Sequence, residues 1–350
     1  MRSIGLIIVI AVIMFGISIV YDDLKYLPEI SESYEQERQN KSKQNVEDEK
    51  NIDLPKEGMV QFMSMNQDEL ITKIGEPDQI DPTRYGYQWW TYQTESSDQY
   101  IQFGMDKGVI VSIFVLGNGV DISPLKIGQK VSEIKKFVNI DNQVSMNVDG
   151  NHLRFDLTKE EVRSRPLVEF DGVWAQLYID TFKNSLVGVR YMNPNVLAVQ
   201  RPYSLEYRGE LIESPKLTDE DIVKVQNAEK KQVFNITNII RKQYGVSPLK
   251  WHEQVAKVAF GHSKEMNIEQ YFSHESPISG TLSDRLEKGD VKYVQAGENI
   301  AANYIDGIAA VYGWLNSEGH RKAMLSEDFT HLGVGVYEKH YTQNFIVPFE

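Results

Sequence analysis

The longest apolar run in the chain lies close to its beginning, over residues 4–20 (IGLIIVIAVIMFGISIV). A run of this length is at the short end of the roughly 17–25 apolar residues that span a bilayer core. Arg2 precedes the run and Asp22 and Asp23 follow it, so the positive-inside rule predicts a cytosolic N-terminus and an extracytoplasmic remainder. The stretch after Ser18 lacks the small-residue pattern of a signal-peptide cleavage site. We predict an uncleaved signal anchor over residues 1–21; cleavage would make the protein secreted instead.

The next segment, residues 22–58, is mostly polar and charged and contains few large apolar residues. Such a sequence cannot bury enough apolar surface to offset the entropy that is lost when the chain becomes ordered. We therefore predict a disordered tether that holds the folded part of the chain away from the membrane surface.

Two similar successions of patterns follow over residues 59–199. In the first, a helical pattern over residues 67–74 precedes the alternating runs YGYQWWTY, QYIQFGM and VIVSIFVLG. In the second, LKIGQKVSEIKKFV precedes HLRFDL, VWAQLYID and LVGVRYM. Period-two alternation predicts strands that pair through short turns. We predict an internal duplication, in which each half is a small helix-plus-antiparallel-sheet module.

The first aromatic run offers two interpretations. Tyr and Trp dominate binding hot spots, so Tyr85, Tyr87, Trp89, Trp90 and Tyr92 could form a binding platform. In a strand, however, Tyr85, Tyr87 and Trp89 face one side and Trp90 and Tyr92 the other. We therefore expect at least one of these two sets to pack in a core.

A polar, proline-bearing linker over residues 200–217 precedes the last predicted domain, residues 218–350. Thr218 with Asp221 three residues later forms a capping-box-like helix start. Apolar residues then follow one helical face until Gly245 ends the helix. A second helix is predicted over about residues 251–268. The fold class is therefore α+β, with two or three folded parts in 350 residues.

Composition excludes several classes of function. The net charge of −13 opposes phosphate neutralisation, so DNA and RNA are not expected as partners. The chain contains no cysteine, which excludes disulfides, thiol catalysis and thiolate metal sites. Histidine, aspartate and glutamate are then the only strong candidate ligands for a metal ion.

Seven short blocks follow one another in the last domain. They are VFNITNIIRKQYGVSPLKW, VAKVAFGHSKEM, YFSH, SDRL, AGENIAANY, YGWLNSEGHRKAML and FTHLGVGVY. Their order and spacing resemble bacterial members of the CAP superfamily (cysteine-rich secretory proteins, antigen-five and pathogenesis-related proteins) over residues 222–350. The earlier Gly-x-Pro-Asp turn at residues 75–78 and the aromatic strand resemble small extracytoplasmic modules of the BLIP and SmpA type, which accompany CAP domains in bacteria.

The CAP resemblance implies a three-layer α/β/α sandwich whose cleft collects two histidines and one or two glutamates. His274, Glu298 and His320 occupy the matching positions in this chain. Two imidazoles and a carboxylate could bind zinc or a similar divalent ion, with one position open to water. Without a metal, the same groups could transfer protons or form a structural polar network.

Two further residues have a structural interpretation. The segment WLNSEGH is shorter than in many eukaryotic relatives and leaves only Glu318 in reach of the cluster, where it would simply favour the start of a helix. His262 lies on the Val255, Ala259 and Met266 side of its helix, so a hydrogen-bonded core histidine is expected.

Three functions remain open. The first is a membrane-tethered extracytoplasmic protein that binds a peptide, lipid or cell-wall component. The second is a metal-dependent hydrolase, peptidase-like, in which His274 and His320 bind the metal and Glu298 is a third ligand or the general base. The third is a structural protein of envelope or spore assembly. The residues contain no complete nucleophile, base and orienting group, and this favours binding.

Overall fold

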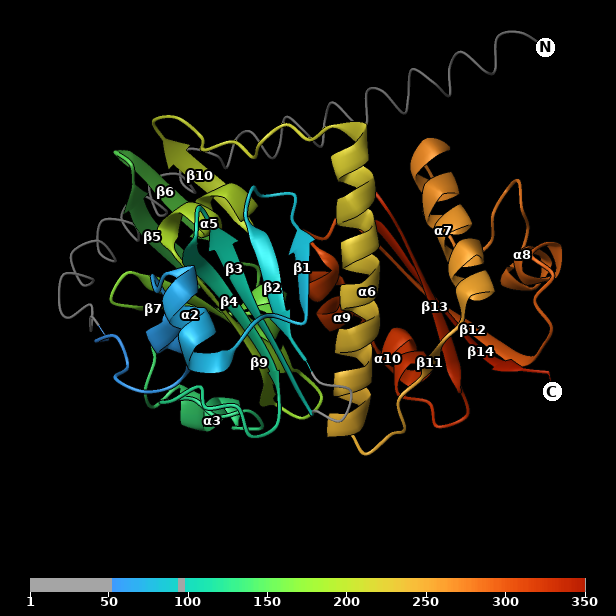
Figure 1. Ribbon diagram of the computed structural model, residues 1–350, viewed down its shortest axis with the longest axis horizontal. Coiled ribbons are helices and arrows are strands. Elements are labelled where there is room, and N and C mark those ends of the chain that lie inside the picture. Colours follow the sequence, from blue (N-terminus) through green and yellow to red (C-terminus); the bar gives the residue numbers. More distant parts are fainter. Residues whose placement is uncertain (1–51, 94–97, 350) are drawn as a thin grey trace, which may run out of the picture. The chain divides into compact units, whose positions relative to one another are not determined.

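The computed structural model describes residues 52–93 and 98–349 (Figure 1). The predicted signal anchor and most of the predicted tether lie outside these residues. Within the described residues, no helix is long and apolar enough to cross a membrane. The predicted α+β class is confirmed, because the described residues form helices and three sheets, in which the strands are mainly antiparallel.

The N-terminal part of the described chain forms one seven-stranded sheet with the order β1-β2-β3-β4-β9-β8-β7. A smaller sheet has the order β10-β6-β5. The strands are β1 (Gln79–Pro82), β2 (Gln88–Tyr92), β3 (Gln99–Asp106), β4 (Val109–Gly117), β5 (Gln143–Val148), β6 (Asn151–Asp156), β7 (Leu167–Phe170), β8 (Val173–Asp180), β9 (Ser185–Met192) and β10 (Ser204–Arg208). The helices are η1 (Met59–Phe62), α2 (Gln67–Ile74), α3 (Val131–Ile134), α4 (Lys159–Ser164) and α5 (Pro194–Gln200).

The two predicted halves share this large sheet instead of forming separate modules. Strand β4 of the first half pairs antiparallel with β9 of the second, with Ser112 opposite Met192 and Leu116 opposite Gly188. Every residue of β9 is buried, and β4 is buried over most of its length. A strand that is covered on both faces is favoured at the centre of a sheet. Because its sequence is apolar almost throughout, the sequence does not show which strand will pair with it.

The aromatic strand belongs to the core, as the alternation predicted. Tyr87 and Trp89 lie in one apolar cluster, and Trp90 lies in the cluster on the other face of the sheet. These three side chains are less than a tenth exposed. They are therefore not available as an open binding platform.

The C-terminal part contains a four-stranded sheet with the order β11-β13-β14-β12. Its elements are α6 (Asp219–Gln243), β11 (Lys250–Trp251), α7 (Glu253–Ile268), α8 (Leu282–Lys288), β12 (Tyr293–Ala302), α9 (Gly307–Leu315), α10 (Glu318–Met324), β13 (His331–Tyr337) and β14 (His340–Pro348). The predicted capping box at Thr218 and Asp221 begins α6. The second helix begins at Glu253, close to the predicted position, and ends at Ile268.

Helices cover both faces of this sheet. Helix α7 packs against the face that contains Gly335, where an added Cβ would lie 2.0 Å from the backbone nitrogen of Phe260. The glycine therefore lets the helix approach the strand closely. On the other face, Leu332 and Val334 share an apolar cluster with Ile236 of α6 and Val311 of α9. The result is three layers, with helices on either side of the sheet.

Helix α6 joins the two parts of the molecule. It contacts β1, β3 and β4 of the seven-stranded sheet and β13 of the four-stranded sheet, and Figure 1 shows it between the two. One apolar cluster includes Tyr87 and Phe114 from the first part and Val233 and Tyr312 from the second. The two parts therefore share a core.

Candidate functional site

The cluster begins with His274, which lies in the loop after α7. Its Nδ1 lies 2.9 Å from Oε1 of Glu298 in β12. The histidine side chain is 55% exposed, whereas that of Glu298 is only 3% exposed. The pair therefore connects a buried carboxylate to an imidazole that solvent and solutes can reach.

A buried arginine neutralises Glu298. Arg285 of α8 donates from Nη2 to Oε2 of Glu298 over 2.6 Å, and its side chain is 4% exposed. Its Nη1 donates to the carbonyl oxygens of His274 (3.0 Å) and Gly280 (2.8 Å). Arg285 therefore holds the carboxylate and the loop that contains His274 in fixed positions.

Sequence reasoning did not assign Arg285 a role. The only signal was its place in the SDRL block, where a basic residue near the end of a short helix also fits the helix dipole. A charge that is buried beside an opposite charge can be identified only from the folded chain, because nothing in the local sequence shows that α8 meets β12.

His320 completes the trio. It lies in the first part of α10, and its ring centre is 6.3 Å from that of His274. Its backbone carbonyl accepts a hydrogen bond from Nδ2 of Asn299 over 3.0 Å. Burial, and secondly the neighbouring His274, lower the pKa of His320 below its usual 6.5. The side chain is therefore mainly neutral at pH 7.

His262 is the buried core histidine that the helical spacing predicted. It is 1% exposed, and its Nε2 lies 3.0 Å from the carbonyl oxygen of Ser273. The same nitrogen lies 3.9 Å from Oε1 of Glu298. Burial lowers the pKa of His262. His262 therefore packs behind the cluster in a neutral form and fixes the loop that leads to His274.

Glu318 is exposed in the first turn of α10. A carboxylate in this position interacts favourably with the positive end of the helix. This placement agrees with the structural interpretation of Glu318.

The trio in this arrangement does not fit a metal site that uses Glu298 as a ligand. One oxygen of Glu298 lies within hydrogen-bonding distance of His274, and the other accepts from Arg285. A cation would have to displace a buried guanidinium to reach the second oxygen. Within the described residues, no group of three or more His, Asp and Glu side chains is placed to hold a metal ion.

A cavity of about 700 Å³ opens beside His320. Its walls come from the end of α7 and the following loop, from β12 and from α9, α10 and β14. The lining combines apolar and hydrogen-bonding side chains: Met266, Gln270, Tyr271, Phe272, Ile300, Ala301, Ala302, Asn303, Tyr304, Gly313, Trp314, Ser317, His320 and His340. Phe272 is 54% exposed, so its ring is available at this site.

The N-terminal module holds the helix that contains His320. Asp180, at the end of β8, accepts from Nη2 of Arg321 over 2.9 Å. Oδ1 of Asn316 accepts from the backbone nitrogen of Thr181 over 2.8 Å, and its Nδ2 donates to the carbonyl of Ile179 over 2.8 Å. The position of His320 therefore depends on contacts from outside the C-terminal domain.

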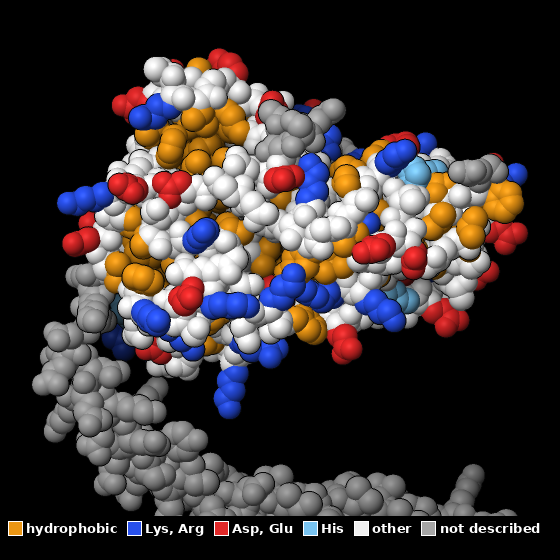
Figure 2. Space-filling model, turned by 90° about the horizontal axis from the view of Figure 1, so that it is seen from below, with side chains coloured by type: hydrophobic (Ala, Val, Ile, Leu, Met, Phe, Trp, Pro, Cys, Tyr) orange, Lys and Arg blue, Asp and Glu red, His pale blue; other side chains and the backbone are white. Residues whose placement is uncertain are grey.

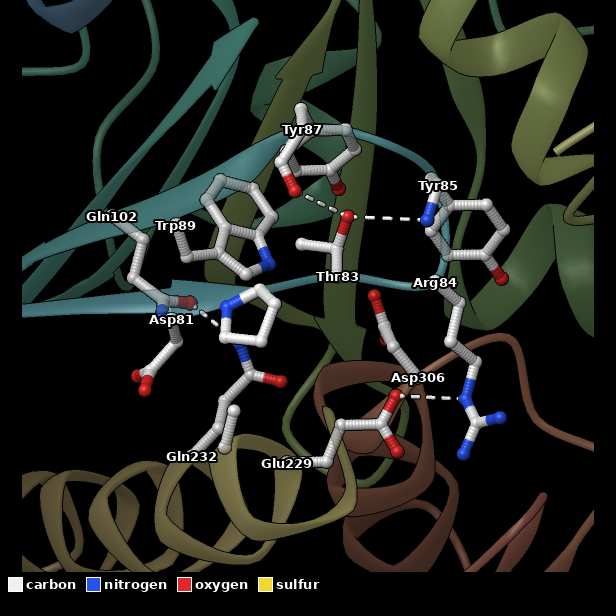
Figure 3. A pocket seen from close by; sticks show the side chains of 12 residues that line it. Asp81, Thr83, Arg84, Tyr85, Tyr87, Trp89, Gln102, Glu229, Gln232 and Asp306 are labelled. Atoms are coloured by element: carbon white, nitrogen blue, oxygen red, sulfur yellow. Dashed lines mark hydrogen bonds and ion pairs between the residues drawn. The ribbon is translucent and has the colours of Figure 1, made fainter. Parts of the chain in front are cut away.

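A second polar cluster lies where β1 and β2 meet α6 and the start of α9 (Figure 3). Arg84 lies 3.4 Å from Glu229 and 3.2 Å from Glu338. Arg190 lies 2.6 Å from Asp306. The remaining cavity is only about 10 Å³, which is room for about one water molecule. We call this cluster the interdomain seam; the space left within it is too small for a ligand.

Comparisons with known proteins agree with this architecture. Residues 63–203 match the family model described as CAP-associated N-terminal, and residues 234–349 match the cysteine-rich secretory protein family. The uncharacterized membrane protein YlbC of Bacillus subtilis is 43% identical over 346 residues, which are 99% of either chain. Uncharacterized protein YkwD of the same organism is 40% identical over 122 residues, 34% of this chain and 48% of YkwD.

Two solved structures are similar over most of the chain. An extracellular protein containing an SCP domain from Bacillus anthracis is 43% identical with a TM-score of 0.80, over 86% of this chain and 99% of its own. A cysteine-rich secretory protein from Staphylococcus aureus is 26% identical with a TM-score of 0.75, over 84% and 97%. The chain therefore belongs to the cysteine-rich secretory protein (CAP) family and has a CAP-associated N-terminal domain before its CAP domain.

Proposed function

We propose that this protein is a membrane-tethered, extracytoplasmic binding protein whose CAP domain takes a peptide, lipid or other cell-envelope component into the cavity beside His320. The cavity carries this proposal. Its volume of about 700 Å³ lies within the roughly 300–1,000 Å³ of ligand sites, and apolar and hydrogen-bonding groups line it together.

The location follows from the sequence and from the relatives. The apolar run over residues 4–20 is long enough for an anchor, and the charges around it favour an extracytoplasmic C-terminal part. The YlbC relative is named a membrane protein, and the B. anthracis relative is described as extracellular. Both descriptions agree with a folded part that works outside the cell and remains attached to the membrane.

The two alternatives have weaker support. A hydrolase that uses Glu298 as a metal ligand or general base has to compete with His274 and Arg285, which already contact one carboxylate oxygen each. A purely structural cluster would be enclosed like the interdomain seam. The His274 side chain is 55% exposed, and its ring centre lies 6.3 Å from that of His320, which lines the cavity; this favours contact with a ligand.

Filling the cavity tests the proposal. Ser317 lines it at the start of α10, so Ser317→Trp places an indole in the space that a ligand would occupy. Immobilised full-length protein in detergent micelles is incubated with separate lipid, wall-glycan and peptide fractions of a bacterial envelope. We expect one fraction to be retained by the wild-type protein and retained at least tenfold less by the Ser317→Trp variant.

Lys322→Trp provides the matched control. Lys322 is an exposed residue of the same helix and does not line the cavity. The control adds the same indole and should retain the fraction as well as the wild type. Equal retention by the wild type and the Ser317→Trp variant, or no retained fraction, would contradict the proposed function.

A further inference from the structure

A second cavity, of about 300 Å³, lies between α4 of the N-terminal domain and α9 of the CAP domain. Its lining consists of Thr158, Glu160, Glu161, Ser164, Arg165, Tyr178, Tyr304, Ala309, Tyr312, Gly313 and Asn316. Tyr304 and Gly313 also line the larger cavity beside His320. The two cavities therefore meet at these two residues, and both domains contribute to the combined space.

Tyr304 forms the boundary between the cavities. Its hydroxyl lies over Gly313 of α9, where an added Cβ would be 2.2 Å from the phenolic oxygen. Only glycine at this position lets the ring lie so close to the helix. Tyr304 follows the end of β12 and is only partly buried, so part of this residue remains accessible at the boundary.

We infer that the two cavities form one groove that binds an extended polypeptide segment. One part of the segment occupies the cavity beside His320, and its continuation passes Tyr304 into the cavity at α4. This inference rests on the proposed function and adds to it the chemical class of the ligand and the participation of the N-terminal domain.

The lining favours a polypeptide over an acyl chain. Hydrogen-bonding groups from Asn303, Ser317 and His320 stand among apolar groups in the first cavity. In the second cavity the Ser164 hydroxyl donates to the Glu160 carbonyl but can still accept, whereas the Asn316 amide is already paired with Thr181 and Ile179. An acyl chain would cover such groups without providing partners, at about 1–3 kcal/mol for each group left unpaired. A polypeptide brings a donor and an acceptor with almost every residue.

The aromatic residues favour a polypeptide over a glycan. Sugar rings bind on open aromatic faces, but the rings of Tyr178 and Tyr312 stack on each other with their centres 4.1 Å apart. Trp314 is 1% exposed, and its Nε1 donates to the carbonyl of Ile300. The ring of Phe272 is exposed, but this side chain has no polar group that could hydrogen-bond to the hydroxyls of a sugar stacked on it.

Charge limits the ligand further. The acidic groups of α4 are paired, Glu161 with Arg165 and Glu160 with Arg163. Acidic and basic side chains are also interspersed on the face shown in Figure 2. The net charge of −13 repels acidic ligands at long range. We therefore expect a neutral or basic segment.

A random library of twelve-residue peptides displayed on phage provides the probe, because twelve extended residues reach about 40 Å. Full-length protein in detergent micelles selects the peptides, and fluorescence anisotropy measures their affinity. Selected peptides should bind the Ser317→Trp variant at least tenfold more weakly. Ser164→Trp, which fills the second cavity, should weaken the full peptide about tenfold. A peptide shortened at the end that lies in the second cavity should bind the wild type and the Ser164→Trp variant equally well.

Lys159→Trp is the matched control for the second cavity. Lys159 lies on α4, is exposed and does not line the cavity. This variant should bind the full peptide like the wild type. Amide hydrogen exchange of the complex should also show protection in α4 as well as in β12 and α9.

The outcomes separate the inference from the proposed function. Peptides that are sensitive to Ser317→Trp but not to Ser164→Trp would overturn the two-domain groove and leave the binding function intact. Failure to select peptides, with cavity-dependent binding of phosphatidylglycerol vesicles or chitin oligosaccharides instead, would overturn the peptide class alone. Binding of none of these three probes at the cavity would contradict both proposals.

Discussion

The interdomain seam and the Glu298 cluster use the same chemistry in different surroundings. In both, a buried carboxylate lies 2.6 Å from an arginine: Asp306 from Arg190 in the seam, and Glu298 from Arg285 in the CAP domain. The seam leaves a space of only about 10 Å³, whereas the Glu298 cluster continues through His274 to solvent. The buried ion pair of the seam therefore affects only the stability of the fold. The Glu298 cluster affects stability too, but its exposed His274 can also contact a ligand.

The largest expected effect comes from the seam. Arg190→Met leaves Asp306, whose side chain is 7% exposed, without its counter-charge. We expect the free energy of unfolding to fall by about 3–5 kcal/mol, because an uncompensated charge remains buried. Urea unfolding of the full-length protein in micelles measures this loss. Arg163→Met, which removes an exposed ion pair, should cost less than about 1 kcal/mol, and equal losses would contradict the comparison.

A smaller loss is expected at the Glu298 cluster. Arg285→Met removes the buried partner of Glu298 but leaves His274, so we expect about 2–4 kcal/mol of destabilisation. Adding Glu298→Gln should recover part of this loss, since no charge is then buried without a partner. A single Arg285→Met variant that unfolds at the wild-type urea concentration would contradict the assignment of Arg285.

The seam should also give stability a pH dependence. Burial raises the pKa of Glu229 from 4.5 to about 7, although the nearby Arg84 opposes this shift. The folded state therefore binds the Glu229 proton more tightly than the unfolded state does. The resulting contribution to the free energy of unfolding is complete below pH 4.5 and is lost as the pH rises to about 7. In Glu229→Gln the difference in unfolding free energy between pH 5 and pH 7 should shrink. An unchanged difference would contradict this role.

The smallest effect concerns the two histidines of the open cluster. His274 is half exposed, so His274→Ala should change stability by less than about 1 kcal/mol. The pKa of His320 should rise, because the neighbouring imidazolium no longer disfavours its protonation. It should remain below 6.5, since burial is the larger cause of its shift. NMR titration of the His320 ring measures this; an unchanged or lower pKa would contradict the proximity of the two rings.

Several features could be predicted from residues that are close in sequence. The Thr218 capping box, the ends of α6 and α7 and the buried side of His262 depend on spacings of three or four residues. The resemblance of ordered blocks also indicated the family and the trio, and the structure brings His274 to both Glu298 and His320. Local spacing and block order therefore determined the α+β class and the candidate cluster.

Only the tertiary structure decided which distant groups meet. Arg190 lies 116 residues from Asp306 in sequence, and the strands β4 and β9 are apolar enough to pair with several neighbours. The partner of Glu298 and the position of Tyr304 between two cavities likewise depend on how α8 and α9 pack. Periodicity identifies a buried face, but it does not identify what covers that face. The role of Arg285 and the contribution of the N-terminal domain to the groove therefore became visible only in the folded chain.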